Sequence, residues 1–157
     1  MTATPASSES PLRLADHPFV WGMDPEFVAR LSSIAFERSF ESGALLVREG
    51  DPAEEFWLLF SGKVAMEIVL PGRPRTTIQT LGSGDIVGWS WLIEPFVSRF
   101  DARAVKPTRA LGLRASRLRS LMDADPARGY HLLRRLLPVI AERLENTQLQ
   151  LLDLHGR

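Results

Sequence analysis

The sequence predicts an α+β domain in which a short N-terminal helix, an antiparallel β-roll of the jelly-roll type and a long C-terminal helix follow one another. Two observations predict this fold. From position 36 to about 115 the apolar segments are short, and turn residues separate them at intervals of about 8–12 residues, as in β-rolls and barrels. On either side of this region, apolar residues recur at helical spacing. The 157 residues are enough for one domain.

We divide the chain into three parts. Residues 1–15 are small and polar and are expected to form a flexible arm. Residues 16–124 are expected to form the roll with its short helices, and residues 125–157 a helical dimerisation segment. Near the start of the roll domain, Asp24 is a candidate N-cap and Pro25 a first helical residue, which together predict a helix over residues 24–34.

The middle of the chain predicts strands. The apolar segments are residues 45–47, 56–60, 64–70 and 76–81, each followed by a turn that contains glycine or proline. After residue 114 helix formers return. Ser116 is expected to cap a helix that ends near Ala124, and Asp125 with Pro126 to open the last helix. Pro138 lies within that last helix, where it either kinks the helix or separates two helices.

Composition and charge exclude several classes of protein. Lys plus Arg and Asp plus Glu are 19 each, so the net charge is zero and direct binding to nucleic acid is not expected. There is no cysteine, and the three histidines lie outside the predicted strands, so we expect no metal site. No catalytic triad or phosphate loop is legible, so we expect no enzyme. The first residues are not expected to be a signal peptide and no segment is apolar enough to span a membrane, which favours a cytoplasmic protein.

The order and spacing of the turns are characteristic. The segments are VREGDPA (47–53), FWLL (56–59), SGKV (61–64) and LGSGD (81–85), followed by Gly88. Together they resemble the cyclic nucleotide-binding domain of the catabolite activator and of protein kinase A regulatory subunits, over residues 18–154. The resemblance implies a Crp/Fnr-like β-roll that senses a small molecule, and a C-terminal helix that pairs two subunits. In the transcription regulators of this family a helix-turn-helix follows, and this sequence does not contain it.

The family binds its ligand in a short cassette. A glycine and a glutamate open it, a one-turn helix follows, and an arginine before a small residue and an alanine closes it, so that the helix N-terminus and the arginine hold the phosphate. Here Gly88 matches, but Trp89 stands at the glutamate position. With Ala102 as the family's alanine, Phe100 stands at the arginine position and Asp101 at the small one. These departures indicate a ligand other than cyclic AMP or cyclic GMP.

Several cassette residues have alternative interpretations. The candidate ligand-binding residues are Gly88, Trp89, Ser90, Trp91, Leu92, Arg99, Phe100, Asp101, Ala102 and Arg103. The two tryptophans form either an aromatic pocket for a planar or apolar ligand, or a plug that fills the vacated pocket as core. Arg99, Asp101 and Arg103 form either a surface ion network or an arrangement in which Asp101 orients an arginine toward an anion. Ser90 is a candidate cap of the cassette helix.

The C-terminal helix has a regular apolar pattern. Leu133, Leu137, Ile140, Leu144, Thr147, Leu151 and Leu154 are separated alternately by four and three residues. Such a heptad seam is typical of a parallel coiled coil and predicts a C2 homodimer. Polar residues that include Glu142 and Arg143 are expected on its flanks. The alternative is a helix that packs only on its own roll.

Two functions agree with these patterns. The first is a non-catalytic, dimeric sensory or regulatory domain whose diverged cassette binds a small molecule other than cyclic AMP or cyclic GMP. The second is a ligand-free interaction or scaffold module, or a regulatory subunit, for another protein. Neither function requires a fixed cofactor or a membrane.

Overall fold

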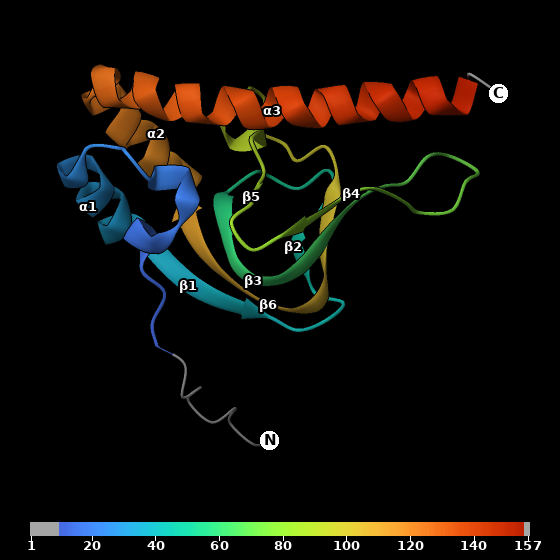
Figure 1. Ribbon diagram of the computed structural model, residues 1–157, viewed down its shortest axis with the longest axis horizontal. Coiled ribbons are helices and arrows are strands. Elements are labelled where there is room, and N and C mark those ends of the chain that lie inside the picture. The colour runs from blue at the N-terminus through green and yellow to red at the C-terminus, as the bar shows by residue number, and fades with distance from the viewer. Residues whose placement is uncertain (1–9, 156–157) are drawn as a thin grey trace.

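Six strands form the body of the molecule, which the computed structural model describes over residues 10–155. In chain order they are β1 (Ala35–Phe40), β2 (Leu45–Val47), β3 (Glu55–Ile68), β4 (Thr76–Gly82), β5 (Ile86–Val87) and β6 (Asp101–Arg114). The strand order is β1-β6-β3-β4, with β2 on β6 and β5 on β3, and these pairings are antiparallel. Figure 1 shows the sheet curled beneath the long helix α3 (Pro126–His155), which confirms the predicted α+β roll.

The roll curls because its two longest strands bend together. β3 and β6 pair along most of their length, but their register shifts between Leu59 and Val64. At this bend Gly62 has a φ of 98°, and a Cβ added there would lie 2.3 Å from Thr108 Oγ1. Only glycine tolerates both conditions. The two segments predicted as separate strands, 56–60 and 64–70, are therefore one bent strand.

Side chains of β3 alternate between two hydrophobic cores. Phe56 and Leu58 pack in a cluster with residues of the helices, among them Phe27. Trp57 and Leu59 belong to a second cluster, made by side chains of the roll itself. This alternation has the two-residue period of a strand that is buried on both faces. One core therefore joins the roll to the helices, and the other fills the interior of the roll.

The N-terminal segment begins to pack on the roll closer to the start of the chain than the sequence predicts. Two short 3-10 helices, η1 (Leu14–Asp16) and η2 (Pro18–Val20), precede α1 (Pro25–Ile34). Leu14 is buried in the core, and the Leu12 N–H donates to Glu37 Oε1 at 2.8 Å. Core packing therefore begins within the segment that the sequence assigned to the arm, because Leu14 is already part of the core. Residues 1–9 of the predicted arm lie outside the described part of the chain.

His17 joins these N-terminal turns to the roll. It is 1% exposed, its Nε2 lies 2.9 Å from the Leu59 carbonyl oxygen, and its Nδ1 accepts the Phe19 N–H at 3.2 Å. The hydrogen-bond partners assign the neutral tautomer with the proton on Nε2. Burial lowers the pKa of His17 below its ordinary value, because the charged imidazolium would lose hydration.

One of two predicted helix N-caps is confirmed by the structure, and the other is wrong. α1 begins at Pro25, and the Asp24 carboxylate accepts the Phe27 N–H at 3.0 Å, as predicted. α2 (Ala115–Ala124) has Arg114 at its N-cap position without a side-chain capping bond, so the predicted Ser116 cap is wrong. The reason is that β6 runs directly into α2, which places Ser116 inside the first turn.

α3 is a single helix, which Figure 1 shows lying along one side of the roll. Asp125 precedes it, and its carboxylate accepts the Arg128 N–H at 3.3 Å. Pro138 lies inside α3 and does not separate two helices. Packing holds the helix on both sides of this proline, because Leu136 and Arg143 are both buried. Among the helices of residues 10–155, none is both long and apolar enough to cross a membrane.

Candidate functional site

The cassette is the segment between β5 and β6, and it begins with a turn that requires glycine. Gly88 has a φ of 92°, in the left-handed region. Residues 90–92 then form a single 3-10 turn, η3. Trp89 occupies the cap position of this turn and provides no capping side-chain bond, so the predicted cap at Ser90 is wrong. A single 3-10 turn has little dipole with which to hold an anion.

The two cassette tryptophans have different surroundings. Trp91 is fully buried, its indole N–H donates to the Gly88 carbonyl at 3.2 Å, and its ring centroid lies 5.3 Å from that of Phe56. Trp89 is only partly buried and lies 6.1 Å from Phe100, between ring centroids. Trp91 is therefore core between roll and helices, and the two rings do not form the shared aromatic pocket that the sequence suggested.

The interior of the roll is filled by its own side chains. Phe100 is 7% exposed and packs in the cluster that contains Met66, Val87 and Ala102. The other buried members of this cluster are Phe40, Leu46, Trp57, Leu59, Val64, Leu81, Ala104 and Ala110. An aromatic ring therefore lies inside the roll at the position that the sequence comparison assigned to the phosphate-binding arginine.

The charged residues at the end of the cassette bind other parts of the roll. The Asp101 carboxylate accepts the Glu49 N–H at 2.7 Å and is 9% exposed, so it stabilises the turn that precedes β3. Arg103 Nε donates to Glu67 Oε1 at 3.0 Å, and Arg99 is exposed. No ion pair within residues 10–155 joins Asp101 to either arginine. These three residues therefore form no ion network with one another, and Asp101 does not orient either arginine.

Arg143 of α3 is the residue that sequence reasoning missed. It was expected on a solvated flank, but it is 6% exposed. Its Nη2 donates to the Ile86 carbonyl oxygen, and its guanidinium carbon lies 5.3 Å from the centre of the Trp89 ring. Burial lowers the pKa of Arg143 to about 10, because the cation has lost hydration. Nη1 has no hydrogen-bond partner in the described structure, and the carboxylates of Asp85 and Glu142 and the Trp89 ring compensate part of the lost hydration.

The sequence contains a pattern that predicts the burial of Arg143. Leu132 and Leu136 are fully buried against the roll, and Val139 is partly buried there. Spacings of four, three and four residues lead from Leu132 through these positions to Arg143, so all four residues share one helix face. An arginine that continues an apolar stripe indicates a cation drawn toward the core.

A second arginine binds the cassette from α2. Arg119 Nη1 donates to the Trp91 carbonyl oxygen at 2.5 Å, and its guanidinium carbon lies 4.3 Å from the centre of the Phe96 ring. We call Arg119 and Arg143 the cassette arginines, because each combines a backbone carbonyl with an aromatic face. Arg119 thereby joins the cassette to α2, and Arg143 joins β5 and the Trp89 ring to α3.

The cassette offers structural hydrogen bonds more than reactive groups. Its serines, Ser90 and Ser98, are both buried, and His17 is held at a backbone carbonyl elsewhere in the fold. Within residues 10–155 no cluster of three or more His, Asp or Glu side chains could hold a metal ion. What the arrangement does is position a loop between two helices.

Residues 37–125, more than half of the chain, match the family model of the cyclic nucleotide-binding domain. This chain belongs to the cyclic nucleotide-binding domain family. The match begins in β1, ends at the residue before α3 and includes the whole cassette. The part of the chain that matches the cyclic nucleotide-binding domain therefore contains the roll, the cassette and α2.

The relatives include a regulator and an enzyme. A CRP-like cAMP-activated global transcriptional regulator of Mycobacterium tuberculosis is 27% identical over 133 residues, 85% of this chain and 58% of the regulator. Glutaminase 1 of Bradyrhizobium diazoefficiens is 29% identical over 131 residues, 83% of this chain but 21% of the glutaminase. The crystal structure of a putative cyclic nucleotide-binding protein from Geobacter metallireducens has a TM-score of 0.76 and 29% identity, and the match covers 87% of this chain and 98% of that one. The chain thus spans 58% of the curated regulator it matches.

Proposed function

We propose that this chain is a dimeric, non-catalytic regulatory domain that binds neither cyclic AMP nor cyclic GMP in its roll. The observation that carries the proposal is Phe100, which is buried in the roll interior. The sequence resemblance assigns this residue to the position where the family has an arginine that holds a phosphate. A cyclic nucleotide would have to displace this ring and then leave its phosphate without a charged partner there. The regulatory signal is a small molecule of different chemistry.

A second candidate is a ligand-free regulatory or scaffold module for another protein. The cassette arginines favour it, because Arg119 holds the loop against α2 and Arg143 covers the Trp89 ring from α3. In that case the input is a protein that binds the dimer. The two candidates share the filled roll and differ in whether a small molecule is recognised.

The non-catalytic part of the proposal is supported by the extent of the matches. The glutaminase matches this chain over about a fifth of its own length, so its reaction is not carried over. The regulator of Mycobacterium tuberculosis matches over more than half of its length. We therefore propose a regulatory role for this chain. We also propose a cytoplasmic location, where such a regulator meets its partners.

Calorimetric titration of the full chain with cyclic AMP and cyclic GMP tests the filled roll. We expect no saturable heat with either nucleotide, and adenosine 5′-monophosphate serves as the control for non-specific binding. Binding of either cyclic nucleotide at micromolar concentration, with none for the control, would falsify the proposal.

The dimer is proposed from the exposed face of α3. Leu137, Leu144, Leu151 and Leu154 of the predicted seam are 61%, 57%, 53% and 76% exposed, while Leu132 and Leu136 of the same helix are buried against the roll. Leu133 of the seam packs partly against the chain's own core, whereas these four leucines leave a second apolar face of α3 exposed. One apolar face is covered by the chain's own roll, and the other needs a partner to remove it from water. Its heptad spacing favours a second copy of the same helix, in parallel.

Sedimentation of two matched variants tests this dimer. Leu144 and Leu149 are 57% and 63% exposed, but only Leu144 belongs to the seam. We expect the wild type and Leu149→Arg to sediment as dimers and Leu144→Arg as a monomer, because buried charge disrupts a coiled-coil core. A wild-type monomer, or equal effects of both substitutions, would contradict the proposal.

A further inference from the structure

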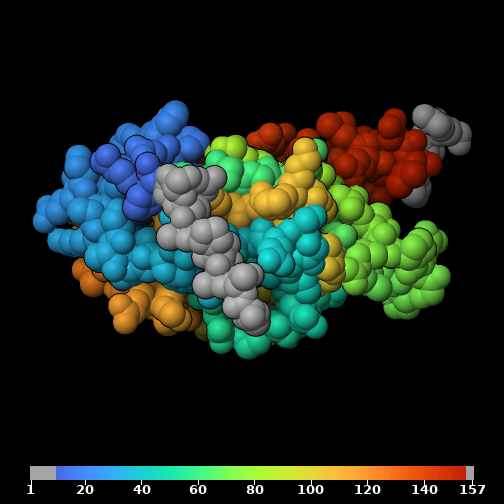
Figure 2. Space-filling model, turned by 90° about the horizontal axis from the view of Figure 1, so that it is seen from below, coloured from blue at the N-terminus to red at the C-terminus, as the bar shows by residue number. Residues whose placement is uncertain are grey.

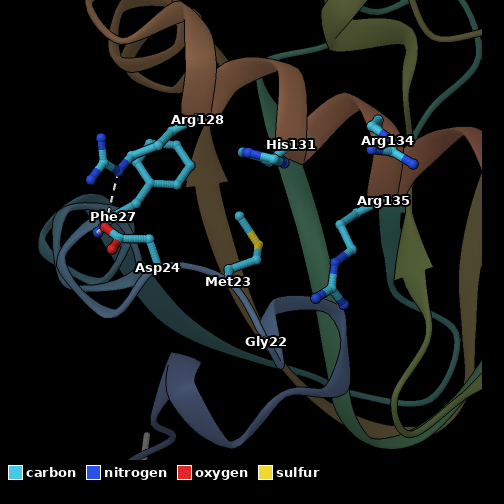
Figure 3. A pocket seen from close by; sticks show the side chains of 8 residues that line it. All are labelled: Gly22, Met23, Asp24, Phe27, Arg128, His131, Arg134 and Arg135. Carbon is cyan, nitrogen blue, oxygen red and sulfur yellow. Dashed lines mark hydrogen bonds and ion pairs between the residues drawn. The ribbon is translucent and has the colours of Figure 1, made fainter.

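A cleft of about 370 Å³ lies between the start of α1 and the first turns of α3, away from the cassette. Figure 3 shows Arg128, His131 and Arg135 leaving α3 toward the turn at Gly22–Asp24. Arg134 lines the same cleft. Arg128, His131 and Arg135 are separated by three, four and seven residues, so they share one face of the helix, and Arg134 lies beside this face. The volume is in the range of sites for small ligands.

The charges that line this cleft do not cancel. Three guanidinium groups stand against one carboxylate, Asp24. That carboxylate is already occupied, because it accepts from Arg128 Nε at 2.9 Å and from the Phe27 N–H at 3.0 Å. Arg128 also pairs with Asp125 at 3.1 Å. The acidic groups are therefore used up by one arginine.

The other two arginines have no acidic partner within the described chain. Arg135 donates to the Trp21 carbonyl oxygen, and the guanidinium carbon of Arg134 lies 5.8 Å from the centre of the Tyr130 ring. Neither has a carboxylate oxygen within 4.0 Å among residues 10–155. Their remaining N–H groups have the planar fork that matches a phosphate or a carboxylate.

The turn opposite α3 is shaped around Arg135. Gly22 has a φ of 81°, and a Cβ there would lie 3.0 Å from Arg135 Nη2. Glycine therefore leaves space for the guanidinium beside the backbone. The partly buried side chain of Met23 and the buried ring of Phe27 provide an apolar wall.

We propose that this cleft binds a small organic anion, through a phosphate or carboxylate group held by Arg134 and Arg135 with the neutral part of the molecule against Met23. This inference rests on the proposed function, because it identifies the chemistry of the ligand of the regulatory domain. Arg135 also donates to the Trp21 carbonyl, so an anion on its remaining N–H groups acts on the turn that leads into α1 and on the start of α3. The signal then enters where the N-terminal segment meets the long helix.

The test is a titration of the full chain with inorganic phosphate and, separately, with acetate, at constant ionic strength, followed by amide chemical shifts. We expect saturable shifts at Gly22, Met23 and Arg135 with at least one of the two anions, and the comparison identifies the head group. Arg134→Gln is expected to weaken binding about tenfold or more, since a charge-assisted hydrogen bond contributes about 1.5–3 kcal/mol. Arg117→Gln, which removes an exposed arginine of α2, is expected to change it little.

The outcomes separate this site from general attraction of anions. Equal weakening by Arg134→Gln and Arg117→Gln would overturn the proposal, and so would the absence of saturation with both anions. The double variant Arg134→Gln, Arg135→Gln is expected to abolish the shifts, provided that its other amide signals show the same fold. Cyclic nucleotide titration and the mass of the dimer are measured independently of this cleft. If the cleft binds no anion, those two measurements still test the proposed function, so the two failures are distinguishable.

Discussion

Truncation of Phe100 tests the filled roll directly. The side chain is 7% exposed, so Phe100→Ala removes a nearly fully buried ring and leaves a cavity in the roll interior. Such substitutions cost about 3–5 kcal/mol when the surroundings cannot collapse. The partly exposed Trp89 ring, whose centroid lies 6.1 Å from that of Phe100, is able to shift toward the space. We therefore expect the lower end, about 3 kcal/mol.

The assay is urea unfolding followed by tryptophan fluorescence, at one fixed protomer concentration because dissociation of a dimer would change apparent stability. A loss of about 3 kcal/mol corresponds to a fall in Tm of about 6–12 °C for a domain of this size. Val105→Ala is the control, because Val105 is 41% exposed on β6, and its change is expected to be within about 0.5 kcal/mol. If Phe100→Ala costs less than about 1 kcal/mol with an unchanged m-value, the ring is not part of a packed interior. The main argument against cyclic nucleotide binding would then fail.

Two further substitutions test buried polar groups. Arg143→Ala leaves the Ile86 carbonyl oxygen without its donor and uncovers the Trp89 ring, so we expect a loss of about 2 kcal/mol and red-shifted indole emission; unchanged emission would show that the guanidinium does not cover the ring. His17 has a lowered pKa in the folded state, so the unfolded chain binds its proton more tightly. Its contribution to stability is full above pH 6.5 and is lost as the pH falls below that value, and His17→Gln should remove this part of the pH dependence. Equal slopes for both proteins between pH 6.5 and about 5 would refute the assignment.

The fold was predictable because its signals are local. The cap at Asp24, the glycine turns and the change from strand to helix patterns each depend on a few adjacent residues. The continuity of β3 through Gly62 was not predictable, since that glycine serves a contact with Thr108, far away in the sequence. The cap at Ser116 failed for a related reason, because β6 passes into α2 without a loop.

The candidate site was less predictable because its contacts join distant segments. The substitutions at Trp89 and Phe100 were visible in sequence, but their packing was not. Asp101 binds a backbone N–H 52 residues away, and Arg143 binds a backbone carbonyl 57 residues away. Every residue except proline carries the same backbone N–H and C=O groups, so no sequence motif predicts which of them a distant side chain binds. The heptad seam on α3 was legible from spacing alone, and its pairing with a second copy stays a prediction.

The cassette arginines have a consequence for the direction in which a signal travels. Coupling between two sites is reciprocal, so a loop that is bound to two helices reports their movements as readily as it imposes its own. Arg143 of α3 contacts the loop at the Trp89 ring, and Arg119 of α2 binds its Trp91 carbonyl. Ile93, 53% exposed beside these contacts, lies where the loop meets solvent. A displacement of α3 would therefore reach the loop that carries Ile93 through the contact between Arg143 and Trp89.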